Sequence, residues 1–296
     1  MEPPYVPPPQ PGPIEPQPIE PAFPLTREDY DLSDLLSRAS ESWSRDLGAW
    51  VLAMVLYVLI GFGIPTALAF FTGFFGELQG SGSGWSGLRI TLEAATQIIQ
   101  LVLNAIFTLG FWAMALRGLH REPARVGALF SQFSKIWKYI LQSLAIGLGL
   151  ILIIAPILII IFLAFVGPVD RTTPMSEIWE SAGMPLAITF AVGAPVYLYV
   201  ILGLIFAQVE LAFNDDAGPI DAIIYSWRIA RGKRWSILGV GFISMLILSG
   251  SLMLCGIGVL FGAPFATLLV GALYLALRQG ANVPAANTAT TLGRRY

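Results

Sequence analysis

Six long apolar segments constrain the fold of this chain more than any other feature of its sequence. A helix of about 20 apolar residues crosses the hydrocarbon core of a bilayer, and each segment reaches that length. They run from Gly48 to Phe75, Arg89 to Arg117, Lys138 to Val166, Met184 to Phe213, Ser236 to Cys255 and Ile257 to Leu277. Of the 296 residues, 55% are hydrophobic and only 12% are charged, whereas soluble chains carry about a quarter charged residues. The sequence therefore predicts an all-α, polytopic membrane protein with six transmembrane helices.

The basic residues are divided unequally between the two sides of the membrane. Lys and Arg in short loops are retained on the cytoplasmic side. With six spans, fifteen of the 17 Lys and Arg fall on the side that holds both termini, and only Arg89 and Arg171 fall on the other. We therefore expect a multi-pass protein whose N- and C-termini are both cytoplasmic.

Three amphipathic stretches precede the first, third and fifth spans, and their apolar positions share one register. Each stretch follows the i, i+3, i+4, i+7 spacing of a helix face. The sets are Leu32, Leu35, Leu36 and Ala39; Val126, Leu129, Phe130 and Phe133; and Ile220, Ile223, Ile224 and Trp227, each 94 residues after the previous one. This offset predicts three repeats, at about 32–125, 126–219 and 220–283, each an interfacial helix followed by a two-span hairpin.

The interfacial helices are expected to lie in the headgroup plane with their apolar faces toward the lipid. Four basic residues lie at the end of the third helix and just after it: Arg228, Arg231, Lys233 and Arg234. Each is a candidate contact for an anionic headgroup, worth about 1 kcal/mol near the surface. Membrane lipids, anionic ones included, are therefore expected partners.

The two ends of the chain differ from the membrane domain, which we place at residues 26–283. Residues 1–25 contain eleven of the 21 prolines, which predicts an extended, disordered cytoplasmic tail. The tail is either a spacer or a proline-rich ligand for a cytoplasmic partner, because Pro8 to Pro11 and Pro13 to Pro16 each fit a PxxP spacing. Residues 284–296 are expected to form a short cytoplasmic tail.

The second span carries polar residues along one helix face. They are Glu93, Gln97, Gln100, Asn104 and Thr108. At about 100° per residue all five fall within an arc of about 80°. Polar groups in hydrocarbon are costly, so this face is expected to meet other helices, water or a ligand. It is either a polar path through the membrane or a source of hydrogen bonds between helices.

A second polar group is expected near the cytoplasmic ends of the spans. Glu210 lies near the end of the fourth span, at the same height as Arg117 and His120 in the predicted topology. These three residues are candidates for an interfacial ion pair, with a proton relay through Glu210 and His120 as the alternative.

Three stretches of the chain resemble a known group of membrane domains. They are LSDLLSRASESWSRDLGAWVL, IDAIIYSWRIARGKRWSILGV and GAPFATLLVGALYLALR. The first two are similar to the helices that precede spans in the membrane domain of some bacterial glycerophosphoryl diester phosphodiesterases and related multi-span inner-membrane proteins, and the third is similar to the end of that domain. The likeness covers about residues 30 to 280. It implies a fold and a location in the bacterial inner membrane, and it transfers no catalytic residue.

The reactive residues are too few for most kinds of catalysis. The chain has one Cys and one His, and no nucleophile is paired with a base at a recognisable spacing. We therefore expect no cofactor, no metal and no enzymatic activity, and the charge pattern gives no reason to expect nucleic-acid binding. The predicted function is that of a structural or accessory subunit of a larger inner-membrane assembly, with other membrane protein subunits as partners. The alternative is a transporter, channel or lipid-handling protein that uses the polar face of the second span.

Overall fold

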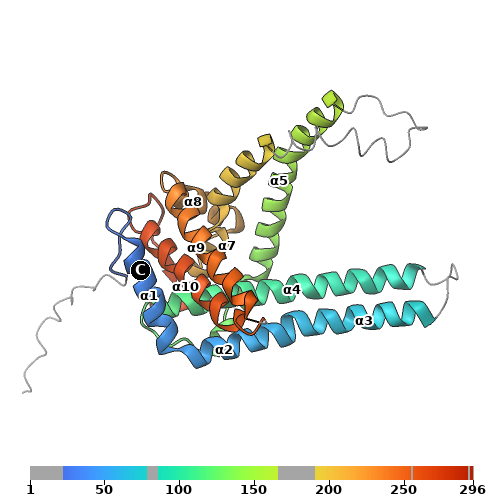
Figure 1. Ribbon diagram of the computed structural model, residues 1–296, viewed down its shortest axis with the longest axis horizontal. Coiled ribbons are helices and arrows are strands. Elements are labelled where there is room, and N and C mark those ends of the chain that lie inside the picture. The colour runs from blue at the N-terminus through green and yellow to red at the C-terminus, as the bar shows by residue number, and fades with distance from the viewer. Residues whose placement is uncertain (1–22, 79–85, 166–190, 255, 293, 296) are drawn as a thin grey trace, which may run out of the picture.

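The computed structural model describes residues 23–78, 86–165, 191–254, 256–292 and 294–295, and these residues are almost entirely helical. Figure 1 shows a helical body from which two arms extend. The elements are α1 (Leu32–Arg45), α2 (Leu47–Leu56), η1 (Tyr57–Phe62), α3 (Gly63–Leu78), α4 (Ser86–Leu119), η2 (Val126–Phe130), η3 (Phe133–Lys135), α5 (Ile136–Phe165), α7 (Ala207–Phe213), α8 (Pro219–Ala230), α9 (Arg234–Met253), α10 (Val259–Arg278), β1 (Asn287–Thr288), α11 (Ala289–Leu292) and β2 (Arg294–Arg295), with a further helix over residues 191–204.

Six of the helical stretches are long and apolar enough to cross a membrane. They are Leu47–Phe71, Ile90–Leu119, Val126–Pro156, Ala191–Phe213, Arg234–Met253 and Val259–Arg278. The prediction of a multi-span helical membrane protein with six candidate spans is therefore confirmed, and each predicted segment overlaps one of these stretches. Residues 166, 184–190 and 255 of the predicted segments lie outside the described residues.

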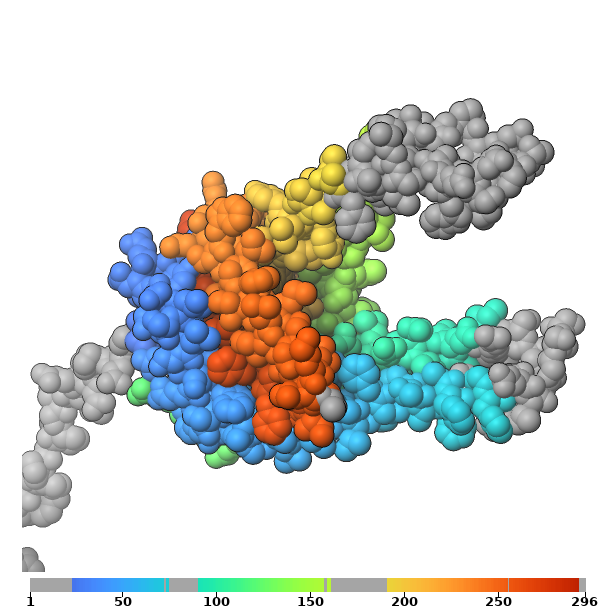
Figure 2. Space-filling view, in the orientation of Figure 1, coloured from blue at the N-terminus to red at the C-terminus, as the bar shows by residue number. Residues whose placement is uncertain are grey.

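The sixth span, α10, is the centre of the body. It packs against α9, α1, α4, α2 and α8, and its side chains from Leu268 to Leu277 include many that are fully buried, such as Leu268 and Tyr274. The two arms are formed by α3 with the N-terminal half of α4, and by α5 with residues 191–204. Figure 2 shows the arms leaving the body on separate paths. Their exposed apolar side chains suit contact with lipid or with other helices.

The first span is interrupted by the π-helix η1, between α2 and α3. The amide nitrogen of Gly63 donates to the carbonyl oxygen of Val58, five residues earlier. Pro65 follows closely, and a proline lacks the N–H that would bond the carbonyl four residues before it, here that of Gly61. The helix accommodates this loss by a local widening, and such widenings occur frequently at functional sites.

Of the three stretches predicted to be interfacial helices, two are α-helical, α1 and α8, and the third forms tighter turns. Residues 126–135 form the two 3-10 turns η2 and η3, so the prediction of an α-helix there is wrong. The physical reason is close packing on α4: a Cβ added at Gly110 would lie 2.2 Å from the carbonyl oxygen of Leu129. The backbone of η2 therefore rests directly on Gly110.

The apolar faces of α1 and α8 are only partly free to meet lipid. In α1, Leu35 and Ala39 are buried, and this helix packs on α10. In α8, Ala222 is buried, whereas Ile220 and Ile224 are exposed. The expected lipid-facing orientation thus fits the exposed side of α8 and does not fit α1, because α10 covers the apolar face of α1.

Both ends of the described chain pack on the body. Phe23 is buried, and the Nε2 atom of Gln279 donates to its carbonyl oxygen at 2.7 Å. At the other end β1 and β2 pair antiparallel, and Thr288 and Thr291 are fully buried. The segment predicted as a short tail, residues 284–296, is therefore ordered against the helices over much of its length. Residues 1–22 of the predicted proline-rich tail lie outside the described residues.

Candidate functional site

A groove lies between η1 and α4, next to the predicted polar face of the second span. Its volume is about 340 Å³. It is lined by Tyr57, Gly61 and Phe62 from the first span and by Gln97, Gln100, Leu101 and Asn104 from the second. Both sets come from the middle portions of their spans, so the groove lies well inside the membrane-spanning part of the chain.

The structure places three of the five predicted polar residues in this groove. Gln97, Gln100 and Asn104 are exposed and line it. Thr108 is half-buried, and its hydroxyl donates to the Oδ1 atom of Asn104 at 3.3 Å. Glu93 is exposed on α4 but is not part of the lining. The side-chain amides of Gln97 and Gln100 make no hydrogen bond to any residue that the structure describes.

The aromatic side of the groove was not predicted from the sequence. The ring of Tyr57 packs edge-on against Phe62, Phe107 and Phe111, with centroids 5.3–5.7 Å apart. A Cβ added at Gly61 would lie 3.0 Å from this ring, so glycine permits the close approach. The sequence does contain one indication of an irregular helix here: Gly61, Gly63 and Pro65 all weaken a regular α-helix.

Glu210 forms a buried ion pair with a residue that the sequence analysis did not assign to it. Its carboxylate is fully buried and accepts two hydrogen bonds from Arg278, at 2.9 and 3.0 Å. The hydroxyl of Tyr274 donates to it at 2.5 Å, and the Nδ2 atom of Asn214 at 3.3 Å. Such a bidentate, hydrogen-bonded geometry is what a buried carboxylate requires.

The residues predicted to accompany Glu210 have other contacts. Arg117 donates from Nε to the carbonyl oxygen of Thr291, and from Nη2 to that of Thr290 at 3.3 Å. The His120 ring stacks on Phe213, and its Nδ1 atom lies 2.7 Å from the carbonyl oxygen of Leu116. Among the described residues, the cation that contacts Glu210 is Arg278, at the end of α10.

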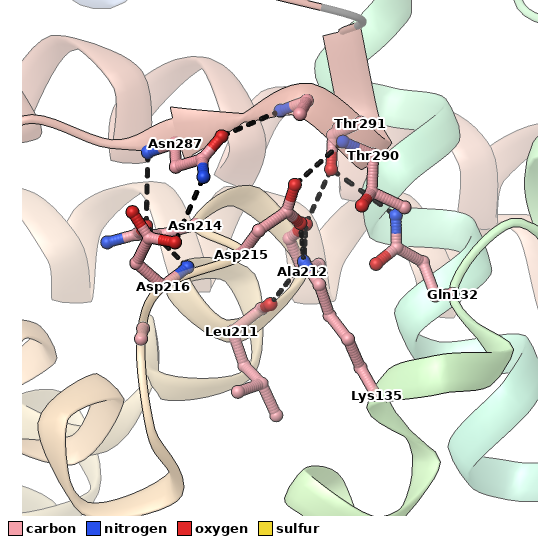
Figure 3. Close-up of polar contacts among 12 residues, drawn as sticks. Gln132, Lys135, Leu211, Ala212, Asn214, Asp215, Asp216, Asn287, Thr290 and Thr291 are labelled. Carbon is pink, nitrogen blue, oxygen red and sulfur yellow. Dashed lines mark hydrogen bonds and ion pairs between the residues drawn. The ribbon is translucent and has the colours of Figure 1, made fainter. Parts of the chain in front are cut away.

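A second charged pair ties η3 to the loop after α7 (Figure 3). The Nζ atom of Lys135 lies 2.7 Å from Oδ1 of Asp215 and donates to the carbonyl oxygens of Leu211 and Ala212, each at 2.9 Å. Those carbonyls belong to the last turn of α7, where a cation is favourable. Burial raises the pKa of Asp215, but hydrogen bonds from Lys135 and Thr290 outweigh this and lower its pKa below the ordinary value.

The C-terminal segment completes this network. The backbone amide of Thr290 donates to Oδ2 of Asp215 at 2.7 Å, and the hydroxyl of Thr291 donates to the carbonyl oxygen of Ala212 at 2.6 Å. Asn287 donates from its side chain to Asp216 at 2.9 Å. Figure 3 shows these groups converging from β1, α11, η3 and the loop after α7. The arrangement joins three separate parts of the chain: η3, the end of α7 with the loop after it, and the C-terminal segment.

The four predicted lipid contacts are not equally available. Arg228 and Arg231 are exposed. Lys233 is half-buried, with its Nζ atom 5.5 Å from the ring centre of Tyr30. The guanidinium of Arg234 lies 3.7 Å from the ring centre of Tyr199 and 4.9 Å from that of Trp227; these cation–π contacts hold it in place.

Within the described ranges, no group of three or more His, Cys, Asp or Glu is placed to hold a metal ion. Comparison with protein-family models, with curated proteins and with solved structures gives no match. The resemblance to the phosphodiesterase-associated membrane domain therefore stays a prediction.

Proposed function

We propose that this chain is a non-catalytic, structural or accessory subunit of a larger assembly in the bacterial inner membrane. One observation carries the proposal: Gln97 and Gln100 on α4 are exposed at membrane depth. Their amides lack hydrogen-bond partners among the described residues. A helix from another subunit would cover this face and supply the missing hydrogen bonds.

The cost of leaving the amides uncovered supports a partner. A polar group in hydrocarbon without a hydrogen bond costs about 2 kcal/mol or more, depending on the reference state. Hydrogen bonds between transmembrane helices regain about 0.6 kcal/mol each relative to the separated helices. Several such bonds, added to the packing of an exposed helix face, favour association over exposure to lipid.

Two charged pairs of the described chain differ from the glutamine amides of α4, because both members of each pair lie within the chain. Glu210 is paired with Arg278, and Lys135 with Asp215, each within this chain. These charged groups fasten the helices of the body together and require nothing from outside. The amides of Gln97 and Gln100 are exposed and have no hydrogen-bond partner among the described residues, so they are candidates for an intermolecular role.

The cytoplasmic surface is proposed to contact anionic lipid through Arg228 and Arg231. Both side chains are exposed at the end of α8, whose Ile220 and Ile224 are also exposed and apolar. A helix with an apolar side and basic residues near its end suits the membrane interface. This placement supports the proposed orientation, with both termini in the cytoplasm.

The alternative function is that of a transporter, channel or lipid-handling protein. The groove favours it, because about 340 Å³ bounded by three amides and an aromatic cluster has the size of a small-molecule site. The π-helix beside it is a feature found at many functional sites.

The two functions are separated by changing the amides and leaving the helix intact. We expect the wild-type protein, extracted in a mild detergent, to have a particle mass well above the 32.0 kDa of one chain. Replacing Gln97 and Gln100 together by Leu should release the chain as a folded single subunit. The matched control replaces Ile98 and Ile99 by Leu, two exposed neighbours at the same depth. Two results together would favour the alternative. The wild-type protein would be extracted as a single chain, and in liposomes it would give a solute flux that the Gln97 and Gln100 double variant lacks.

A further inference from the structure

We propose that the subunit covering the amide face of α4 is a second copy of this chain, packed parallel to the first through α4. This inference rests on the proposed function and names the partner. It is carried by the spacing, exposure and chemistry of five residues that we call the α4 seam: Ile90, Glu93, Gln97, Gln100 and Asn104.

The spacing of the α4 seam is that of a coiled coil. Its five residues are separated alternately by three and four positions, which is the a and d pattern of a heptad repeat. All five are exposed, and the seam runs for about 21 Å along α4 at 1.5 Å per residue. The pattern ends at the next positions, Phe107 and Phe111, which instead pack on Tyr57 within this chain.

The chemistry of the seam suits an identical partner. In a parallel pair of helices an a residue faces the same a residue, and a d residue faces the same d residue. A carboxamide has both donors and an acceptor, so Gln97, Gln100 and Asn104 can each bond their own counterparts. A buried Asn at an a position also fixes the register of parallel two-stranded coils.

Membrane topology imposes the required direction. Every copy of a chain inserts with the same orientation, because the same loops carry the basic residues. Two copies related by a twofold axis along the membrane normal therefore bring α4 against α4 in the parallel sense, through one self-complementary surface.

Gln97, Gln100 and Asn104 of the seam form one wall of the groove between η1 and α4. Phe62 and Gly61 line its far side, and the partner's side chains can enter its volume of about 340 Å³ between η1 and α4.

Cysteine cross-linking in native membranes tests the proposal. In a Cys255→Ser background the chain has no other cysteine, so Gln97→Cys, Gln100→Cys and Asn104→Cys each report on one seam position. We expect oxidation to give disulfide-linked dimers at the seam and at least fivefold less dimer for Ile98→Cys and Ile99→Cys. Those control positions are also exposed and lie about 130° around the helix from the seam centre.

The outcomes separate this inference from the proposed function. A wild-type particle containing two chains of 32.0 kDa, together with cross-links confined to the seam, supports a second copy. Equal cross-linking at seam and control positions overturns it. A photo-cross-linker at position 100 that captures a protein of different mass overturns the second copy while leaving the subunit function intact. A single chain of 32.0 kDa that cross-links to nothing defeats both.

Discussion

Replacing Arg278 by Met would leave the carboxylate of Glu210 buried without its cation. The side chain of Glu210 is fully buried, and Arg278 supplies two of the hydrogen bonds that it accepts. Removing one partner of a buried ion pair typically costs about 3–5 kcal/mol, because the other charge remains in a medium of low polarity. For a chain of this size we expect the thermal midpoint to fall by about 10 °C.

The double variant Glu210→Gln with Arg278→Met tests the cause of this loss. It removes the stranded charge, while Tyr274 and Asn214 can still donate to the new side-chain amide. The bond from Arg278 to the carbonyl oxygen of Pro284 is lost in both variants, at about 1 kcal/mol. We therefore expect the double variant to recover at least half of the lost stability.

The assay is thermal denaturation in detergent micelles. After heating, the fraction of protein that still elutes from a size-exclusion column as the folded species is measured at each temperature. Three proteins are compared: the wild type, Arg278→Met and the double variant. An Arg278→Met protein as stable as the wild type would show that the pair is not buried as described. A double variant no more stable than the single one would show that packing of Arg278, and not the stranded charge of Glu210, dominates.

Three further changes probe other contacts. Gly110→Ala should destabilise the fold by about 1–3 kcal/mol, because its Cβ would meet the backbone of Leu129, whereas Gly147→Ala, with nothing within 4 Å, should be neutral or stabilising in the same thermal assay. Asp215 has a lowered pKa in the folded state. Its contribution to stability is therefore present at neutral pH and lost as the pH falls below about 4. Asp215→Asn should flatten the dependence of the unfolding midpoint on pH in that window. Deleting residues 285–296 should expose the loop after α7 to limited proteolysis, and unchanged digestion would contradict its role in fastening that loop.

The spans could be predicted from the sequence because the bilayer acts on each segment separately. A helix satisfies its own backbone hydrogen bonds, so length and apolar content decide whether it crosses. The predicted segment from Ser236 to Cys255 and the observed helix Arg234–Met253 differ by two residues at each end. The face of α4 was likewise predictable, since Gln97, Gln100 and Asn104 follow helical spacing.

The contacts between segments could not be predicted in the same way. Nothing in the sequence near Glu210 indicates that its cation would come from Arg278, 68 positions later. Residues 126–135 have the periodicity of a helix, yet contact with Gly110 selects 3-10 turns. Each of these features depends on how helices approach one another, and a single chain without aligned relatives carries little information about that.

The distribution of polar groups also bears on how the proposed subunit could insert into the membrane and associate. A charged side chain at the centre of a span costs about 2.5–3.5 kcal/mol at insertion. Glu210 and Arg278 lie near the C-terminal ends of the candidate spans Ala191–Phe213 and Val259–Arg278, where this cost is lower. Amides impose a smaller penalty than charges and still prefer a polar partner. A face made of Gln97, Gln100 and Asn104 can therefore enter the bilayer as part of a single chain and then drive association with a second helix.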